Sequence, residues 1–302
     1  MSDTHTKMHA DEVDIDEALV ERLVAAQFPR WAGLPVRKVR SAGTDNAMYR
    51  LGEDMSVRLP RIPGAEGQVA KEQRWLPHLA PHLPLEVPVP LGQGVAGEGY
   101  PFAWSVYRWL DGENLFDEPL TEPHEAAAGL GNFVTALRRI DTAGGPRSFR
   151  GGPVGTADAA VRAAIRDLGA DGTLDAQAAT AAWKAAVRVP QWEGAPVWLH
   201  GDLLPGNLLG RRGRLSAVID FGGVGVGDPA CDVMAAWTLL SADTRGVFRE
   251  AAGVDDATWA RGRGWALRFG LTAEHHYRVT NPVLARVAHR ATAEAIADHH
   301  RG

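Results

Sequence analysis

Asp202, Asn207 and Asp220 are the residues of this chain whose types and spacing are best suited to chemistry. Asp202 and Asn207 flank a Pro-Gly turn, so both side chains can face the same side of one loop. Asp220 follows the apolar run of residues 215–219 and precedes a Phe-Gly pair that permits a sharp exit from a strand. A carboxylate that orients an attacking hydroxyl, with two oxygen ligands for Mg²⁺, is what transfer of the terminal phosphoryl group of a nucleotide requires.

The expected roles follow from this chemistry. Asp202 would accept a hydrogen bond from the acceptor hydroxyl, Asn207 and Asp220 would hold Mg²⁺, and His200 would support the loop through hydrogen bonds. Taken singly, each residue has a simpler interpretation, since an aspartate after a strand is usually a turn or cap residue. The combined pattern, His-x-Asp-x4-Asn followed by Asp-Phe-Gly after an apolar strand, is rare by chance.

The composition is that of a globular protein of a reducing compartment. The chain has 302 residues, 45% of them hydrophobic, and a formal net charge of -5, so nucleic acid is not expected as a main partner. Cys231 is the single cysteine, which excludes an internal disulfide and a cysteine-rich zinc site. The polar start lacks the features of a signal peptide, and no run approaches the ~20 apolar residues of a membrane span. We expect a cytoplasmic protein without a membrane partner; the sequence does not indicate an oligomeric state.

The pattern of apolar residues predicts an α+β protein of two lobes. Residues 1–13 are expected to be disordered, and a helix is expected after Asp14. An extended stretch with a hairpin turn at 52–54 follows, then a helix over 66–79 and a strand over 102–109. We predict an N-terminal nucleotide-binding lobe over residues 1–110 and a C-terminal catalytic and substrate-binding lobe over residues 111–302. The second lobe is expected to be helical over about 122–140, 156–169, 173–187, 229–241, 244–252, 256–279 and 283–299, with a β segment over 197–221.

Residues 198–232 resemble the catalytic core of the aminoglycoside phosphotransferase family, which shares the protein-kinase-like fold with other small-molecule kinases. The run Gly227-Asp-Pro-Ala-Cys-Asp232 strengthens the resemblance, because that family follows its metal aspartate with such a turn into a helix; Asp228 would support the site. The resemblance implies an N-terminal antiparallel sheet with a helix, a mainly helical C-terminal lobe, and a kinase that uses ATP or GTP with Mg²⁺. It implies a hydroxyl of a small polar molecule as acceptor, an aminoglycoside or macrolide antibiotic or a related metabolite. A role in antibiotic resistance is implied by the family alone.

The same resemblance assigns the nucleotide to the N-terminal lobe. The family's phosphate-holding lysine is replaced here by Arg58, which keeps the charge but changes the geometry. Glu72 lies where the helix partner of that cation is expected. Backbone groups are expected to contact the phosphates in one loop and the base at the interlobe strand. The residues concerned are Thr44, Asp45 and Asn46 for the phosphates, and Arg108, Trp109 and Leu110 for the base.

The acceptor pocket is indicated only by the family, some members of which bind cationic antibiotics with carboxylates of C-terminal helices. The candidates are Asp243, Asp255, Asp256 and Glu274. Each of them has the alternative interpretation of a solvated acid on a helix surface.

Two other functions stay open at this point. The glycine-rich run after Asp220 has some likeness to the dinucleotide-binding turn of a Rossmann-type oxidoreductase, although its glycine spacing misses the fingerprint by one residue. The chain could also be a non-catalytic kinase-like protein that only binds a ligand, although such a protein would be expected to have lost one of the three site residues.

Overall fold

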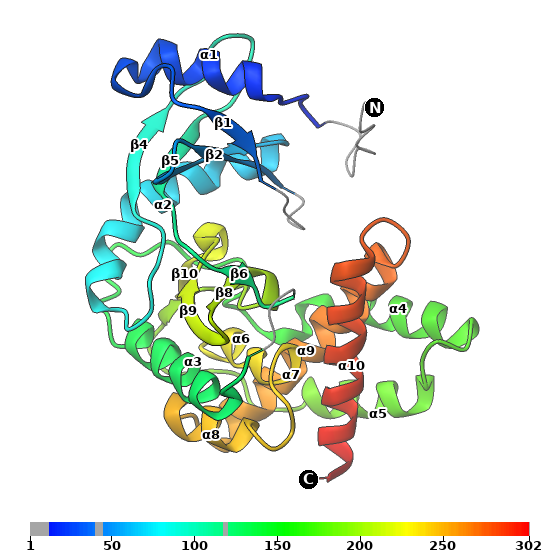
Figure 1. The fold of residues 1–302 in the computed structure, drawn as a ribbon. Helices are drawn as coiled ribbons and strands as arrows, with labels where there is room; N and C mark the ends of the chain where they lie inside the picture. Colours follow the sequence, from blue (N-terminus) through cyan, green and yellow to red (C-terminus); the bar gives the residue numbers. More distant parts are fainter. Residues whose placement is uncertain (1–11, 40–44, 117–119, 302) are drawn as a thin grey trace. The chain divides into compact units, whose positions relative to one another are not determined.

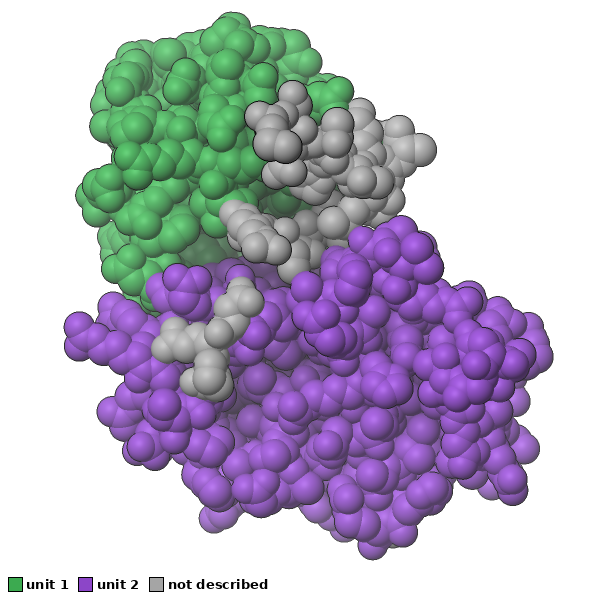
Figure 2. All heavy atoms as spheres, turned by 45° about the vertical axis from the view of Figure 1, so that its right-hand side comes forward, with its two compact units in different colours: residues 1–81, 86–111 green, residues 82–85, 112–302 purple. Residues whose placement is uncertain are grey.

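The computed structural model describes residues 12–39, 45–116 and 120–301, and Figure 1 shows their arrangement in elements. The chain divides into two compact units, coloured in Figure 2: residues 1–81 with 86–111 form unit 1, and residues 82–85 with 112–302 form unit 2. The predicted boundary fell after residue 110, one residue earlier, and it did not assign residues 82–85 to the second unit. Within the described ranges, no helix is long and apolar enough to cross a membrane.

Unit 1 is built on an antiparallel sheet of five strands in the order β1-β2-β3-β5-β4. Its strands are β1 (Val36–Lys38), β2 (Asn46–Leu51), β3 (Met55–Pro60), β4 (Pro90–Gly94) and β5 (Trp104–Arg108). Its helices are α1 (Glu17–Gln27) and α2 (Glu66–Leu79), with short 3-10 turns η1 (Pro29–Trp31), η2 (Pro63–Ala65) and η3 (Ala80–His82), the last at the unit boundary.

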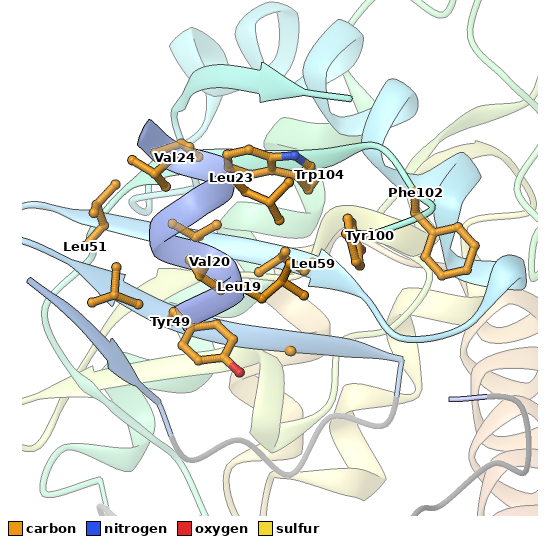
Figure 3. Packing of buried hydrophobic residues seen from close by; sticks show 14 residues of the cluster. Leu19, Val20, Leu23, Val24, Tyr49, Leu51, Leu59, Tyr100, Phe102 and Trp104 are labelled. Carbon is orange, nitrogen blue, oxygen red and sulfur yellow. The ribbon is translucent and has the colours of Figure 1, made fainter. Parts of the chain in front are cut away.

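The core of unit 1 lies between helix α1 and the sheet, as Figure 3 shows. α1 presents Leu19, Val20, Leu23 and Val24, which recur at helical spacing and are buried. They pack with alternate residues of the strands and with Trp104, all of them buried. This packing fixes the register of the β2–β3 hairpin, and with it the position of Arg58 on β3.

The start of the chain differs from the expectation. The side chain of Asp16, and not that of Asp14, caps α1 by accepting a hydrogen bond from Leu19 N at 2.8 Å. Residues 1–11 lie outside the described residues, but Glu12 and Val13 are bonded to Arg61, so the predicted disorder is wrong for these two. Strand β4 was not predicted, because a proline begins it; a proline can stand at the start of an edge strand.

Unit 2 is mainly helical, with short strands between its helices. The strands are β6 (Glu113–Asn114), β7 (Val197–Leu199), β8 (Leu208–Arg211), β9 (Arg214–Val218) and β10 (Gly225–Gly227). The helices are α3 (Pro123–Arg138), α4 (Asp158–Ala170), α5 (Ala176–Ala186), α6 (Ala230–Val233), α7 (Ala235–Thr238), α8 (Arg245–Ala252), α9 (Asp256–Tyr277) and α10 (Pro282–Arg301), with 3-10 turns η4 (Val154–Ala157), η5 (Pro205–Asn207) and η6 (Phe221–Gly223).

Helices α9 and α10 lie side by side and form the largest helix pair of unit 2 (Figure 1). They approach closely at Gly270, where a Cβ atom would meet Ala288 O at 2.7 Å. A buried ion pair then joins α9 to the segment before α6: Arg261 Nε donates to Asp228 Oδ2 at 2.8 Å. The helices thereby hold in place the short strands that carry the candidate site.

Candidate active site

Asn207 and Asp220 are brought together by the β8–β9 hairpin. Leu208 of β8 pairs with Val218 of β9, so Asn207 lies opposite Ile219 at the open end of the hairpin. The backbone confirms this pairing, because Ile219 N donates to Asn207 O at 2.9 Å. Asp220 follows Ile219 directly, and neighbouring strands are about 4.8 Å apart. Asn207 and Asp220 therefore lie at the same end of a two-stranded ribbon.

Asp202 is held beside Asn207 by two hydrogen bonds. Asn207 Nδ2 donates to the backbone O of Asp202 at 2.8 Å and to its Oδ2 at 2.9 Å. Because the amide nitrogen faces Asp202, the amide oxygen of Asn207 is turned away from Asp202. The carboxylate at 202 and the amide at 207 thus belong to one rigid unit.

Asp220 occupies the left-handed region of the backbone, with φ 61° and ψ 71°. A non-glycine residue in this region is uncommon and carries strain that the surrounding structure must hold. Its Oδ1 accepts a hydrogen bond from Gly222 N at 3.3 Å, which forms the turn η6. The sharp exit expected from the Phe-Gly pair is therefore formed by Asp220 itself.

His200 fixes the loop between the two site segments. Its Nδ1 accepts a hydrogen bond from Asp202 N at 3.2 Å, so Nε2 carries the ring proton and donates to Ile219 O at 3.0 Å. The imidazole, which is fully buried and packs edge-on against Phe221, thereby ties Asp202 to the residue before Asp220.

Asp232 anchors the same loop through its carboxylate. From the sequence, Asp232 was noted only as the end of a motif and was assigned no role of its own. Its two carboxylate oxygens accept the backbone N–H groups of His200 at 2.7 Å and Gly201 at 2.8 Å. Burial raises the pKa of this carboxyl, and the hydrogen bonds from the two N–H groups oppose that effect in part. Gly201 has φ +82°, and a Cβ atom there would meet Gly223 O at 2.7 Å, so glycine is required at this point.

Asp228, expected to support the site, is buried and paired with Arg261. Its Oδ1 also accepts a hydrogen bond from Ala230 N at 3.0 Å, which begins helix α6. No sequence pattern indicated Arg261, because this residue lies on α9, far from Asp228 in the sequence.

Arg150 contacts Asp202, and no sequence pattern indicated it. Its guanidinium forms an ion pair with the Oδ1 of Asp202, and its Nη1 also donates to Gly201 O at 3.0 Å. Burial alone would lower the pKa of Arg150, but the charge of Asp202 raises it. The residue lies in a Gly- and Pro-rich loop between α3 and η4, where no periodicity or motif predicts its direction.

In unit 1, Arg58 and Glu72 meet in a buried ion pair. Arg58 Nη1 lies 2.5 Å from Glu72 Oε1, and the two side chains are 9% and 2% exposed. Arg58 Nη2 also donates to Gln68 Oε1 at 3.1 Å, and the hydroxyl of Tyr107 donates to Glu72 Oε2. Burial, and then the charge of Glu72, raise the pKa of Tyr107 well above its usual value. Gln68 could have been found from its i, i+4 spacing to Glu72 on one helix face.

The other residues expected to contact the nucleotide are placed as follows. Thr44 lies outside the described residues, Asp45 accepts a backbone hydrogen bond from Arg61 N at 2.8 Å, and Asn46 Nδ2 donates to Gln68 Oε1 at 3.3 Å. At the end of β5, Arg108 N donates to Val89 O at 2.9 Å and Trp109 N to Asp54 O at 2.8 Å. The amide of Leu110 has no such partner within the described ranges, so of the three it is the one open to a ligand.

A family model described as the phosphotransferase enzyme family matches residues 36–265, more than half of the chain. The chain belongs to this family. It is accordingly a small-molecule kinase, as the motif indicated. A search of the curated proteins found no match.

Solved structures of related phosphotransferases share the fold. The GDP complex of wild-type aminoglycoside 2'-phosphotransferase-IIIa matches with a TM-score of 0.70 at 20% identity, over 94% of this chain and 100% of that chain. Macrolide 2'-phosphotransferase MphH from Brachybacterium faecium, an apoenzyme, matches with a TM-score of 0.57 at 25% identity, over 92% and 98%. A complex of APH(4)-Ia with AMP-PNP and hygromycin B gives 0.61 at 19% identity, over 93% and 98%. The predicted α+β, protein-kinase-like fold is confirmed.

The oxidoreductase alternative is wrong for this phosphotransferase. After Asp220 the glycine-rich run forms η6 and then β10, which pairs antiparallel with β7. A dinucleotide-binding turn instead joins a strand to a helix within a parallel βαβ unit. The glycines serve close backbone approaches, as at Gly225, where a Cβ atom would meet Ser148 N at 2.6 Å.

The four carboxylates expected at the acceptor pocket have other partners in the phosphotransferase. Asp255 caps α9 through Thr258 N at 2.6 Å, Asp256 pairs with Arg249, and Asp243 bonds Ser241. Glu274 lies 2.9 Å from His289 Nδ1 between α9 and α10. Asp255 thus serves as a cap and Glu274 lies in a helix contact, and none of the four is bonded to Asp202, Asn207 or Asp220 by a contact in the described ranges.

The donor set of the site fits Mg²⁺. Asn207 Oδ1 and the carboxylate of Asp220 are hard oxygen ligands, and Mg²⁺ takes one or two protein ligands together with phosphate oxygens and water. Within the described residues, no group of three or more His, Cys, Asp or Glu side chains is arranged to hold a metal ion. The arrangement therefore suits a cation that is shared with a phosphate ligand.

Proposed function

We propose that the chain transfers the terminal phosphoryl group of ATP or GTP, with Mg²⁺, to a hydroxyl of a small polar molecule. The observation that carries the proposal is the joining of Asp202, Asn207 and Asp220 through one hairpin and two hydrogen bonds. A carboxylate for the acceptor hydroxyl and two oxygens for a cation are what this reaction requires.

In this reaction Asp202 accepts a hydrogen bond from the acceptor hydroxyl and orients its oxygen toward the terminal phosphorus. The new bond joins the acceptor oxygen to that phosphorus, the bond to the β-phosphate oxygen breaks, and the nucleoside diphosphate leaves. The proton of the hydroxyl passes to Asp202. Mg²⁺, held by Asn207 Oδ1 and Asp220, would neutralise charge on the phosphates.

Arg58 would bind the α- and β-phosphates, with Glu72, Gln68 and Tyr107 holding its guanidinium in place. Backbone groups at Thr44, Asp45 and Asn46 would cover the phosphates. The base would be bound at residues 108–110, where the Leu110 amide is the available donor. The related structures hold GDP, ADP and AMP-PNP, which supports a purine nucleotide without selecting one.

The acceptor class we propose is an antibiotic or a related metabolite, since the related structures are of enzymes that act on aminoglycosides and macrolides. Phosphorylation of an antibiotic hydroxyl would make resistance the physiological role. We place the reaction in the cytoplasm, where nucleoside triphosphates are abundant.

The test is ADP or GDP release from the full chain with Mg²⁺ and a panel of hydroxyl acceptors. Asp202→Ala should lower kcat by about 10²–10⁴-fold, the range for loss of a positioned general base, while AMP-PNP binding stays unchanged. Asp171→Ala, a change in an exposed loop residue, is the matched control and should leave kcat unchanged. Full activity of Asp202→Ala, or turnover that persists in excess EDTA, would contradict the mechanism. Nucleotide binding without transfer to any acceptor would support the non-catalytic alternative.

A further inference from the structure

Each carboxylate oxygen of Asp202 is held by a different side chain. Oδ2 accepts a hydrogen bond from Asn207 Nδ2 at 2.9 Å, and Oδ1 forms an ion pair with Arg150 Nη1. A carboxylate offers about four acceptor positions on its two oxygens, so these bonds leave room for a further donor. The side chain of Asp202 is 27% exposed, and an acceptor hydroxyl can therefore still reach it.

The orientation of this carboxylate depends on both partners. Rotation about the last side-chain bond of an aspartate has no sharp staggered minimum, so contacts must set the plane of its two oxygens. Within the described residues, Asn207 and Arg150 are the side chains bonded to the Asp202 carboxylate. A bond from Asn207 alone would let the plane turn about that contact, whereas a bond on each oxygen fixes it.

Arg150 occupies a central position of a closed four-residue turn. Gly151 N donates to Ser148 O at 3.2 Å, which closes the turn over residues 148–151. Ser148 Oγ accepts a hydrogen bond from Arg150 N at 3.2 Å, so the backbone of Arg150 is itself bonded inside the turn. The side chain of Arg150 therefore leaves the turn in a fixed direction.

Hydrogen bonds at both ends of this turn tie it to the segment that follows Asp220. They are Ser148 N to Val226 O at 3.0 Å, Ser148 Oγ to Gly223 O at 3.2 Å, and Asp228 N to Gly151 O at 3.0 Å. The turn thereby joins Arg150, and through it the carboxylate of Asp202, to the segment that begins at the proposed metal ligand.

The guanidinium of Arg150 has further contacts that hold it in place. The ring of Phe149 lies 5.0 Å from Arg150 Cζ, within the range of a cation–π contact. Arg150 Nη1 also donates to Gly201 O at 3.0 Å. A guanidinium only donates hydrogen bonds and stays protonated in proteins, so Arg150 can orient Asp202 but cannot act as a base in its place.

Resting on the proposed kinase function, we propose that Arg150 is a positioning residue, which holds the carboxylate of Asp202 at the angle from which it orients the acceptor hydroxyl. Arg150 acts through Asp202 and touches neither the acceptor nor the nucleotide. Positioning is sensitive to displacement, because a misplacement of about 1 Å can lower a rate by about 10²-fold. Loss of Arg150 should therefore lower turnover and leave the binding of both substrates in place.

The experiment is steady-state kinetics of nucleoside diphosphate release by the full chain, with Mg²⁺ and the most active acceptor of the panel. In Arg150→Met, which keeps an unbranched side chain without the charge, kcat should fall by about 10²-fold while KM for the nucleotide and the acceptor stays unchanged. Arg150→Lys keeps the charge without the planar fork, and its kcat should lie between those of Arg150→Met and the wild type. Arg147→Met removes an exposed charge just before the same turn; it is the matched control and should keep the wild-type kcat.

Chemical rescue guards against a folding defect in Arg150→Met. Millimolar guanidinium chloride should raise kcat of Arg150→Ala, because the ion can occupy the space that the side chain leaves beside Asp202. Urea, which has a similar shape without the charge, should not raise it, and guanidinium should not raise kcat of Asp202→Ala.

Unchanged kcat in Arg150→Met, or an equal loss in Arg147→Met, would overturn the proposal. A rise in KM for the acceptor or the nucleotide at unchanged kcat would make Arg150 a binding residue and overturn it too. Failure of guanidinium to rescue Arg150→Ala would assign Arg150 a purely structural role, against the proposal. These outcomes leave the kinase function standing, since that is measured on the wild type. No transfer by the wild type to any acceptor would overturn the kinase function, and the role of Arg150 with it.

Discussion

Replacing Glu72 by alanine should destabilise unit 1 strongly. Glu72 accepts hydrogen bonds from Arg58 and from the hydroxyl of Tyr107, and it is 2% exposed. Its removal takes one partner from a buried ion pair, a change that destabilises by about 3–5 kcal/mol. The hydroxyl of Tyr107 loses its hydrogen bond to Glu72 as well, although the side chain of Ser105 remains a partner, and the figure includes this loss.

The assay is native-state hydrogen exchange of peptides from β3 and α2 in rising urea, because a whole-chain transition would mix the two units. Arg58→Met and Glu72→Leu should each give a loss similar to that of Glu72→Ala. The double variant that combines Arg58→Met with Glu72→Leu should be much less destabilised than the sum of these two single changes. Glu21→Ala, an exposed change on α1, should stay within about 0.5 kcal/mol of the wild type. Additive losses in the double variant would refute the claim that the two charges are coupled.

Three further outcomes follow from the structure. Asp232→Ala should accelerate hydrogen exchange of the amides at His200 and Gly201, because each amide loses a buried acceptor, a loss of about 1–3 kcal/mol. The rate of phosphoryl transfer should fall in the same variant. Unchanged slow exchange of the peptide that contains His200 and Gly201 would contradict the anchor role. Tyr49 has a pKa raised to about 12 by burial, so its contribution to stability is complete below pH 10 and is lost as pH rises toward 12; urea midpoints across this range should fall less in Tyr49→Phe than in the wild type. Gly201→Ala should abolish transfer, because the added Cβ atom meets Gly223 O at 2.7 Å; an active variant would show that the loop can move.

Much of the fold was accessible from the sequence where a local pattern decides the structure. The β2–β3 hairpin and helix α2 lie where the turn at residues 52–54 and the helical spacing placed them. The motif around Asp202 could be recognised in the sequence because one loop and one hairpin, both short, set the spacing of its residues. For the same reason the pairing of Arg58 with Glu72 could be anticipated from the family's pattern.

The remainder depends on contacts between distant segments, which no local pattern records. Arg150 reaches Asp202 across fifty-two positions of sequence, and β10 pairs with β7 only because the intervening loops return it there. Asp16 rather than Asp14 caps α1, a choice that depends on where the helix first packs on the sheet. The acidic residues near α9 resembled pocket residues in sequence, but Asp255 and Glu274 serve a helix end and a helix contact.

The arginine at position 58 has a practical consequence for chemical labelling. Lysine-directed reagents are electrophiles that are attacked by an uncharged amine, whereas a guanidinium stays protonated at any usable pH. An amine-directed nucleotide analogue would therefore find no target on β3. On α2, Lys71 has a pKa lowered by burial, so a larger share of its amine is uncharged and reactive than in an ordinary lysine. A modified peptide from α2 would then report the reactivity of Lys71 and would leave Arg58 unmarked.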